Sequence, residues 1–314
     1  MGLMKVTIGT RGSALALWQA RHVSALIEKN NPDIRVDLMK IKTTGDKILD
    51  APLANIDGKG LFTKEIEEAL LDDRVDLAVH SMKDLPTELP AGLKLTAIME
   101  REDPRDVFIS SDGTGPEDLQ PGSRVGTSSL RRSAFLLNRY PDLQIIPIRG
   151  NVDTRLKKIE SENLAGVLLA SAGIKRMGFA ERITAYLDLE FMIPAIGQGA
   201  LGIESRLDDP GVDSIVMALN HPQTSQCVRM ERAFLRRMGG GCQVPLAAHA
   251  VADSDRIRVT AAVVHPDGKP MIRGTLDGPP DDELSGAKLA DTLIGRGADS
   301  IMRSVHGADW EPGP

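Results

Sequence analysis

A cysteine that follows three glycines is the residue of this chain best suited by its type and surroundings to act as a nucleophile. Gly239-Gly240-Gly241-Cys242 places a thiol beside residues without side chains, so a large group can approach it closely. A thiolate is a strong nucleophile towards an electron-poor carbon. The chain has 2 cysteines in all, too few for a disulfide framework to be the simplest reason for a cysteine at this position. The alternative for Cys242 is a small buried apolar residue at the end of a helix.

A second cluster combines a carboxylate with a lysine. His80-Ser81-Met82-Lys83-Asp84 follows an expected strand at residues 77–79. A carboxylate at a strand end, such as Asp84, can act as an acid or base or stabilise a cationic intermediate. A loop ion pair between Lys83 and Asp84 is the plainer interpretation, and spacing alone favours it.

Arginine and hydroxyl side chains collect where expected strands end and expected helices begin. In doubly wound sheets ligands bind at these ends, and helix N-termini present backbone N–H groups there. The guanidinium fork suits carboxylate or phosphate, so the pattern predicts a site for a multiply anionic small molecule. Solvated arginines paired with nearby acids are the alternative. The residues are Arg11, Ser13, Thr127, Ser128, Ser129, Arg131, Arg132, Arg149, Arg155 and Arg176.

Two glycine motifs do not carry a nucleotide site. Gly197-Gln198-Gly199-Ala200-Leu201-Gly202 has the dinucleotide-binding spacing, but that motif opens a helix and needs an acid about twenty residues further on. Here Ile203-Glu204-Ser205 follows, with no suitable acid at the end of a second strand. Gly58-Lys59-Gly60 lacks the flanking residues of a phosphate loop. The histidines and cysteines have no metal-ligand spacing, so no metal site is predicted.

The elements that position these residues alternate between strand and helix. Strands are expected at 6–9, 36–41 and 77–79, and again at 107–109, 124–126, 145–148 and 167–170. This alternation predicts parallel βαβ units. Gly9-Thr10-Arg11-Gly12-Ser13 and Gly126-Thr127-Ser128-Ser129 share one order of strand, Gly-Thr, hydroxyl cap and helix. The fold class is therefore α/β, with two similar doubly wound domains.

The last third of the chain changes character. A helix is expected at 224–238, an antiparallel strand at 257–263, a turn at Asp267-Gly268, a strand at 271–276 and a helix at about 284–305. These elements form a small α+β domain. The predicted boundaries are residues 1–100 with 198–219 for domain 1, 101–197 for domain 2 and 220–314 for domain 3.

Composition narrows the class of protein. The chain has 314 residues, 41% hydrophobic and 26% charged, as in ordinary folded proteins. A net charge of −6 and 3% aromatic residues argue against nucleic-acid binding. No apolar run is long enough to cross a membrane and no signal peptide is evident. We therefore expect a cytoplasmic protein without nucleic-acid or membrane partners.

Eight motifs in one order resemble the porphobilinogen deaminase family, also called hydroxymethylbilane synthase. They cover essentially the whole chain, and their combination is far more specific than any single motif. The motifs are Thr10-Arg11-Gly12-Ser13-Ala14-Leu15-Ala16, Gly58-Lys59-Gly60-Leu61-Phe62, Val79-His80-Ser81-Met82-Lys83-Asp84, Arg101-Glu102-Asp103-Pro104-Arg105-Asp106, Gly126-Thr127-Ser128-Ser129-Leu130-Arg131-Arg132, Arg149-Gly150-Asn151-Val152-Asp153-Thr154-Arg155, Pro194-Ala195-Ile196-Gly197-Gln198-Gly199-Ala200 and Gly240-Gly241-Cys242-Gln243-Val244-Pro245.

The resemblance implies a transferase of porphyrin and heme biosynthesis. Such enzymes join four porphobilinogen molecules head to tail with loss of ammonia, through linear pyrrole intermediates, and release hydroxymethylbilane by hydrolysis. It implies two domains like periplasmic binding proteins and a third that bears the cysteine. It also implies a dipyrromethane cofactor attached by a thioether, with Cys242 at the matching position. Nothing in the sequence suggests an obligate assembly, so we expect a monomer.

The resemblance also assigns roles to side chains. Asp84 matches the catalytic carboxylate. Lys59 and Phe62 fall in the active-site loop, whereas Asn55 receives no role because many relatives carry lysine in that region, and Cys227 is expected to be structural. The matching binders of cofactor and substrate carboxylates are Arg11, Ser13, Gln19, Ser81, Lys83, Thr127, Ser128, Ser129, Arg131, Arg132, Arg149, Arg155, Arg176 and Gln198.

Two other functions stay open on the residues alone. A non-catalytic binder of a small dicarboxylate or oxyanion would use the same anion-binding loops. A transferase of acyl or phosphoryl groups would use Cys242, but the nearby sequence suggests no base for its thiol.

Overall fold

The computed structural model describes residues 4–47, 60–240, 245–280 and 282–314. The chain divides into two compact units. Unit 1 comprises Met1–Arg101 with Ala200–Ser225, and unit 2 comprises Glu102–Gly199 with Gln226–Pro314. Each unit is therefore built from two separate stretches of sequence.

Unit 1 contains a five-stranded sheet in the order β2-β1-β3-β10-β4. The strands are β1 (Met4–Thr10), β2 (Ile34–Lys40), β3 (Leu77–Ser81), β4 (Leu93–Ile98) and β10 (Leu201–Arg206). β1 lies parallel to both β2 and β3, whereas β10 runs antiparallel to β3 and β4. The strand that returns to the sheet late in the sequence therefore lies between two strands from the first hundred residues.

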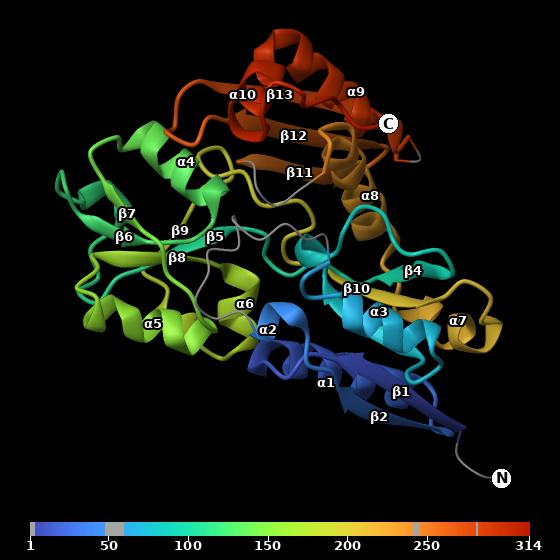
Figure 1. Cartoon of the computed structure of the whole chain (residues 1–314). Coiled ribbons are helices and arrows are strands. Elements are labelled where there is room, and N and C mark those ends of the chain that lie inside the picture. The colour runs from blue at the N-terminus through green and yellow to red at the C-terminus, as the bar shows by residue number, and fades with distance from the viewer. Residues whose placement is uncertain (1–3, 48–59, 241–244, 281) are drawn as a thin grey trace. The chain divides into compact units, whose positions relative to one another are not determined.

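Helices cover both faces of this sheet (Figure 1). α1 (Ala14–Asn30) and α7 (Pro210–Val216) pack on one face through Val23, Ile27 and Val212. α3 (Lys64–Leu71) packs through Ile66 and Leu70 in a separate cluster with Ala78. A further short helix, α2 (Thr44–Lys47), follows β2. The apolar stripes of these helices supply the burial that holds the layers together.

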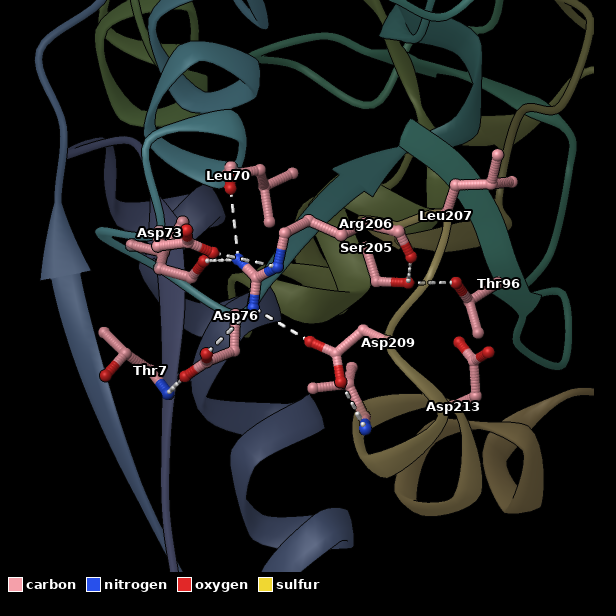
Figure 2. A network of polar contacts seen from close by, with 12 residues as sticks. Thr7, Leu70, Asp73, Asp76, Thr96, Ser205, Arg206, Leu207, Asp209 and Asp213 are labelled. Carbon is pink, nitrogen blue, oxygen red and sulfur yellow. Dashed lines mark hydrogen bonds and ion pairs between the residues drawn. The ribbon is translucent and has the colours of Figure 1, made fainter. Parts of the chain in front are cut away.

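Arg206, the last residue of β10, is the centre of a network of polar contacts that Figure 2 shows. Its guanidinium donates to the backbone carbonyls of Leu70 and Val75 at 3.0 and 2.7 Å. It also pairs with Asp76 at 3.2 Å and Asp209 at 2.9 Å. One side chain thus ties β10 to the α3–β3 connection and to the start of α7.

Unit 2 contains a second five-stranded sheet, ordered β7-β6-β8-β5-β9. The strands are β5 (Asp106–Ile109), β6 (Arg124–Gly126), β7 (Gln144–Ile146), β8 (Gly166–Ala170) and β9 (Ala185–Tyr186). β6 is parallel to β7 and β8, and β5 is antiparallel to β8 and β9. Order and direction match the unit 1 sheet strand for strand. The expected repeat at Gly9 and Gly126 therefore extends to the topology of both sheets.

The helices of this second sheet again lie on two faces. α4 (Leu130–Arg139) packs through Phe135 and Leu136 on one face. α5 (Val152–Ser161) and α6 (Ser171–Arg176) pack in the cluster on the other, with Ile159 and Ile174 as core residues.

A third, antiparallel sheet is also part of unit 2, in the order β11-β12-β13. β11 (Leu246–Asp253), β12 (Arg256–Val264) and β13 (Met271–Gly278) pack one face against α8 (Pro222–Arg237), α9 (Leu284–Leu293) and α10 (Asp299–His306). The other face supplies Ala247 and Ala262 to the cluster that contains α4. Figure 1 shows α9 and α10 above the small sheet and α8 at its right-hand side.

The α/β fold class, with two similar doubly wound sheets and a small C-terminal sheet, is confirmed. The single final helix expected at 284–305 is wrong, because the chain breaks at Gly297, whose φ of 101° is outside the helical range. β4, β9, β10 and β11 are additional strands. The three-domain boundaries stay a prediction. Among the described residues, no helix has both the length and the apolar character to cross a membrane.

Candidate functional site

A cavity opens to solvent at the carboxyl ends of β1 and β3 in unit 1. Its walls come from the starts of α1 and α3 and from the turn after β3. In a parallel pair of strands these ends face the same way, so one edge of the sheet gathers all these segments. The lining residues are Arg11, Ser13, Leu15, Ala16, Gln19, Phe62, Thr63, Ile66, Val79, His80, Ser81 and Asp84.

Asp84 is the carboxylate of this cavity that faces solvent. It ends the 3₁₀ helix Met82–Asp84, which follows β3 directly. Met82 is buried beneath it, which fixes the turn, whereas Asp84 is exposed. Lys83, half-buried, lies in the same turn. The structure therefore presents Asp84 at the cavity wall on a short, anchored element.

Arg11 is held in place from two sides. Its guanidinium pairs with Asp46 of α2 and stacks over the ring of Phe62, with its central carbon 4.1 Å from the ring centre. Burial disfavours the charged carboxylate of Asp46, but hydrogen bonds from Arg11 and Thr43 outweigh burial and lower its pKa. Arg11 thus enters the cavity as a preorganised cation rather than as a mobile side chain.

Hydroxyl and amide groups complete this side of the site. Ser13 is the N-cap of α1, and its Oγ accepts a hydrogen bond from Ala16 N at 3.3 Å. Gln19, one turn further along α1, is buried and donates to Ser81 Oγ at 2.9 Å. Helix α1 and strand β3 are therefore linked by a polar contact at the cavity itself.

In unit 2 the hydroxyl triplet caps α4 as the repeat predicts. Ser129 Oγ accepts from Arg132 N at 3.4 Å, and Thr127 Oγ1 accepts from Ser129 N at 3.1 Å. Ser128 Oγ donates to the carbonyl of Ile148 at 2.6 Å. These contacts fix the turn between β6 and α4, where backbone N–H groups of the first helical turn are available to an anion.

The two arginines behind the triplet converge on one buried carboxylate, Asp106 of β5. Arg131 Nη1 pairs with it at 2.7 Å, and Arg132 Nη2 pairs with it at 2.8 Å. Gln198 Nε2 donates to the same carboxylate at 3.1 Å. Burial opposes ionisation, but the two guanidinium groups hold the pKa of Asp106 far below its usual range. With two cations and one anion, this buried cluster carries an excess of positive charge.

Three further predicted arginines belong to the same unit: Arg149 lies in the loop before α5, Arg155 lies in α5, and Arg176 is the last residue of α6. Arg155 donates from Nε to the carbonyl of Gly150 at 2.8 Å, and Arg176 Nη2 donates to the carbonyl of Gly199 at 2.7 Å. Burial lowers the pKa of Arg176, partly offset by Glu102. Arg149 Nη2 is buried and has no hydrogen-bond partner among the described residues, and the same holds for Arg131 Nε.

Two predicted residues, Cys242 and Lys59, lie outside the described residues, as does Asn55. Cys227 is described, and it lies buried in the core cluster of α8 and the C-terminal sheet. Among the described residues, no group of three or more His, Cys, Asp or Glu side chains has the arrangement of a metal site.

The sequence matches two family models along most of its length. Residues 6–214 match "Porphobilinogen deaminase, dipyromethane cofactor binding domain", and residues 225–295 match "Porphobilinogen deaminase, C-terminal domain". A porphobilinogen deaminase from Pelobacter propionicus is 54% identical over 96% of this chain and 97% of its own length. One from Geobacter sulfurreducens is 51% identical over 98% of this chain and 96% of its own. This chain belongs to the porphobilinogen deaminase family.

Solved structures resemble the chain more distantly. A YaeC-family lipoprotein from Enterococcus faecalis has a TM-score of 0.41 and 13% identity, covering 71% of this chain and 93% of its own. A TRAP periplasmic solute binding protein from Chromohalobacter salexigens also has a TM-score of 0.41 and 13% identity, over 73% and 77%. No function is inferred from likeness at this level.

The structure also brings together polar residues that sequence analysis of the porphobilinogen deaminase motifs did not single out. His80 lines the unit 1 cavity, and its Nε2 lies 2.9 Å from Glu204 Oε2. Asp46 holds Arg11, and Asp106 holds Arg131 and Arg132. Glu204 and Asp106 both lie in strands, where a single acid among apolar residues is a visible sign of a buried charge partner.

Proposed function

We propose that the unit 1 cavity and the unit 2 arginine cluster perform the family's reaction in this chain. The reaction joins four porphobilinogen molecules head to tail with loss of ammonia, on a covalently bound dipyrromethane primer, and releases hydroxymethylbilane by hydrolysis. The observation that carries the proposal is the match along nearly the whole chain, within which Asp84 and Arg11 line one cavity.

The residues of unit 2 suit a ligand that bears several carboxylates. The cluster around Asp106 has two guanidinium groups for one carboxylate, and Arg131 Nε and Arg149 Nη2 are buried donors without protein partners. A buried donor left without a partner costs about 1–3 kcal/mol, and a ligand carboxylate would remove that cost. When bound, the cofactor supplies the pyrrole carbon to which the first porphobilinogen is joined.

We assign the proton and charge chemistry to Asp84. Its carboxylate can stabilise the positive charge that develops as ammonia leaves, because a fixed anion at the cavity wall needs no reorganisation during the reaction. Asp84 Oδ atoms can also hold and return a proton as each ring is joined. The anchored 3₁₀ turn keeps this carboxylate in one place through successive additions.

We assign carboxylate binding to the cationic and hydroxyl side chains of both units. Arg11 is already oriented by Asp46 and Phe62, so little side-chain entropy is lost when it binds an anion. Arg131 and Arg132 are proposed to act while still paired with Asp106, which orients them. The assigned residues are Arg11, Ser13, Gln19, Ser81, Lys83, Thr127, Ser128, Ser129, Arg131, Arg132, Arg149, Arg155, Arg176 and Gln198.

We assign the thioether attachment of the cofactor to Cys242, and a covering role to the segment with Lys59 and Phe62. The support for Cys242 is its glycine-flanked motif and the chemistry of a thiol, since Cys227 is buried in a core cluster. We also propose a cytoplasmic monomer without nucleic-acid or membrane partners. A reducing compartment keeps the thiol available, and the net charge of −6 disfavours nucleic acid.

The test is the intact mass of the purified protein. The wild-type mass should exceed the sequence mass by two covalently attached pyrrole units. Cys242→Ser should abolish the excess, whereas Cys227→Ala should retain it. A wild-type mass equal to the sequence, together with no consumption of porphobilinogen, would refute the proposal and leave the non-catalytic binder. Size-exclusion chromatography with light scattering tests the monomer.

A further inference from the structure

Behind the unit 1 cavity lies a buried cluster of three ionisable side chains. His80 is the residue before the last in β3, Glu204 lies on the neighbouring β10, and Glu67 is a buried residue of α3. They are 6%, 0% and 7% exposed. Gly202 is the strand partner of His80 and Ala78 that of Glu204, so the two side chains lie on the same face of the sheet. That face is the one covered by α3.

The contacts of His80 resemble those of a histidine that moves protons. Its Nε2 lies 2.9 Å from Glu204 Oε2, so a carboxylate fixes the orientation of the ring and the position of one proton. His80 also lines the cavity that contains Asp84. With Nε2 committed to Glu204, Nδ1 is the ring nitrogen left to exchange a proton with a molecule in the cavity. An imidazolium formed in this way is stabilised by the carboxylate behind it.

The charges of the cluster also suit proton transfer by His80. Two carboxylates share one imidazole, and Glu204 Oε1 and Glu67 Oε1 are buried without hydrogen-bond partners among the described residues. Burial raises the pKa of Glu67, the Thr63 hydroxyl offsets part of that rise, and the Glu204 carboxylate adds a smaller rise. Two buried carboxylates beside one imidazole stabilise the positive charge that His80 gains when its ring accepts a proton.

We propose that His80, oriented by Glu204 and backed by Glu67, is a second proton-transfer residue of the cavity. This rests on the proposed function. Porphobilinogen enters with its amine protonated, and the C–N electron pair leaves with ammonia. A C–C bond forms to a ring carbon, whose C–H bond then breaks and returns its electron pair to the ring. His80 Nδ1 accepts that proton and passes it to ammonia, which departs as ammonium.

In this scheme Asp84 stabilises positive charge and His80 transfers the proton. Asp84 is an anion suited to a cationic intermediate, whereas a neutral imidazole is suited to accepting one proton and releasing it again near neutral pH. The charged groups near His80 are Glu204 on β10, Glu67 on α3, Lys83 and Asp84 on the 3₁₀ turn, and Arg11 after β1. Each of these groups can affect how turnover depends on pH, so the pH profile of a His80 variant is compared with that of wild type.

The test compares His80→Gln with His249→Gln. Both replace a buried histidine that lies beside a buried carboxylate, but His249 is on β11, paired with Glu231 at 3.4 Å. Turnover is measured from pH 5.5 to 9 with ordinary porphobilinogen and with porphobilinogen deuterated at its unsubstituted ring carbon. His80→Gln should lose about tenfold or more in turnover. It should also lose one ionisation from the pH profile and show a larger deuterium isotope effect than wild type.

His249→Gln should keep the wild-type pH profile and isotope effect. A folded His80→Gln enzyme with an unchanged profile and isotope effect overturns the proposal, even if it is slower, because that pattern indicates a structural role. Should His80→Gln fail to fold, Glu204→Gln preserves shape and must show the same two changes, and their absence there overturns the proposal equally. If wild type carries no pyrrole mass and consumes no porphobilinogen, the proposed function fails instead.

Discussion

Asp106→Asn should destabilise unit 2 strongly. The carboxylate is 0% exposed and pairs with Arg131 and Arg132, while Gln198 donates to it at 3.1 Å. An amide of the same shape leaves two buried guanidinium groups without an anion. Removing one partner of a buried charge pair costs about 3–5 kcal/mol. For a unit of this size each kcal/mol lowers the melting temperature by about 2–4 °C, so the loss should be about 6–20 °C.

Asp103→Asn is the matched control, because it changes the same residue type in the same motif. The Asp103 side chain is itself only 11% exposed, but its partners Arg105 and Lys175 are 41% and 31% exposed, so both cations stay in contact with water when the carboxylate is lost. Ion pairs open to solvent contribute about 0–1 kcal/mol, so the control should lose about 4 °C at most. Differential scanning calorimetry at one scan rate, at pH 7, measures both variants against wild type. Equal shifts for the two variants would refute the argument from burial.

The pH dependence gives a second check on Asp106. Its pKa is lowered on folding, so its contribution to stability is complete above the ordinary carboxyl pKa of about 3.9 and is lost as pH falls below it. The gap in melting temperature between wild type and Asp106→Asn should therefore stay constant from pH 8 to pH 5. It should begin to narrow only below about pH 4. A gap that changes between pH 8 and pH 5 would point to a different titrating group.

Three further predictions concern the site and the frame of unit 1. Asp84→Asn should fold and bind substrate but turn over about 10²–10⁴-fold more slowly in a steady-state assay, and near-normal turnover would remove Asp84 from its role. Arg149→Leu should weaken cofactor assembly or substrate use, and wild-type kinetics with full pyrrole mass would exclude it as an anion binder. Arg206→Met should lower the free energy of unfolding in urea by about 1.5–3 kcal/mol, because it loses charged hydrogen bonds. Arg258→Met removes an exposed ion pair and should change that free energy little. Equal effects of the two variants would contradict the stabilising role of the network in Figure 2.

Local patterns predicted the repeated strand–cap–helix unit well. Ser13 and Ser129 are N-caps because their side chains satisfy backbone N–H groups a few residues ahead, a rule that needs no tertiary information. The turn at Gly268, with φ of 90°, is predictable for the same reason. These features depend on residues close together in the sequence, so the sequence shows them directly.

Strands that pair across long separations were harder to predict. Leu201–Arg206 was considered only as a glycine motif, yet it forms β10 between β3 and β4. Its partner strands lie more than a hundred residues earlier, and the neighbouring sequence does not indicate which residues of those strands it pairs with. A strand and not a helix follows these glycines, whereas the dinucleotide-binding motif requires a helix at that place.

Side-chain partners were the least predictable part of the site. Arg131 and Arg132 were singled out for their type and position, but the sequence did not reveal that both meet Asp106 on a strand twenty-five residues earlier. Likewise His80 stood in a noted motif, while its partner Glu204 is 124 residues away. Such pairs exist only once the sheet has formed, so their charge balance belongs to the fold rather than to any motif.

That charge balance distinguishes two sheets of the same topology. The sheet of unit 2 buries two guanidinium groups against one carboxylate, and the sheet of unit 1 buries two carboxylates against one imidazole. The acids do not occupy equivalent positions, since Asp106 lies opposite the last residue of β8 and Glu204 lies three residues deeper along β3. The repeat therefore preserves the backbone but not the buried charges. A surplus of cations suits the binding of carboxylates, and a surplus of carboxylates suits the transfer of protons, so the buried charges of each sheet are consistent with the separate role proposed for it.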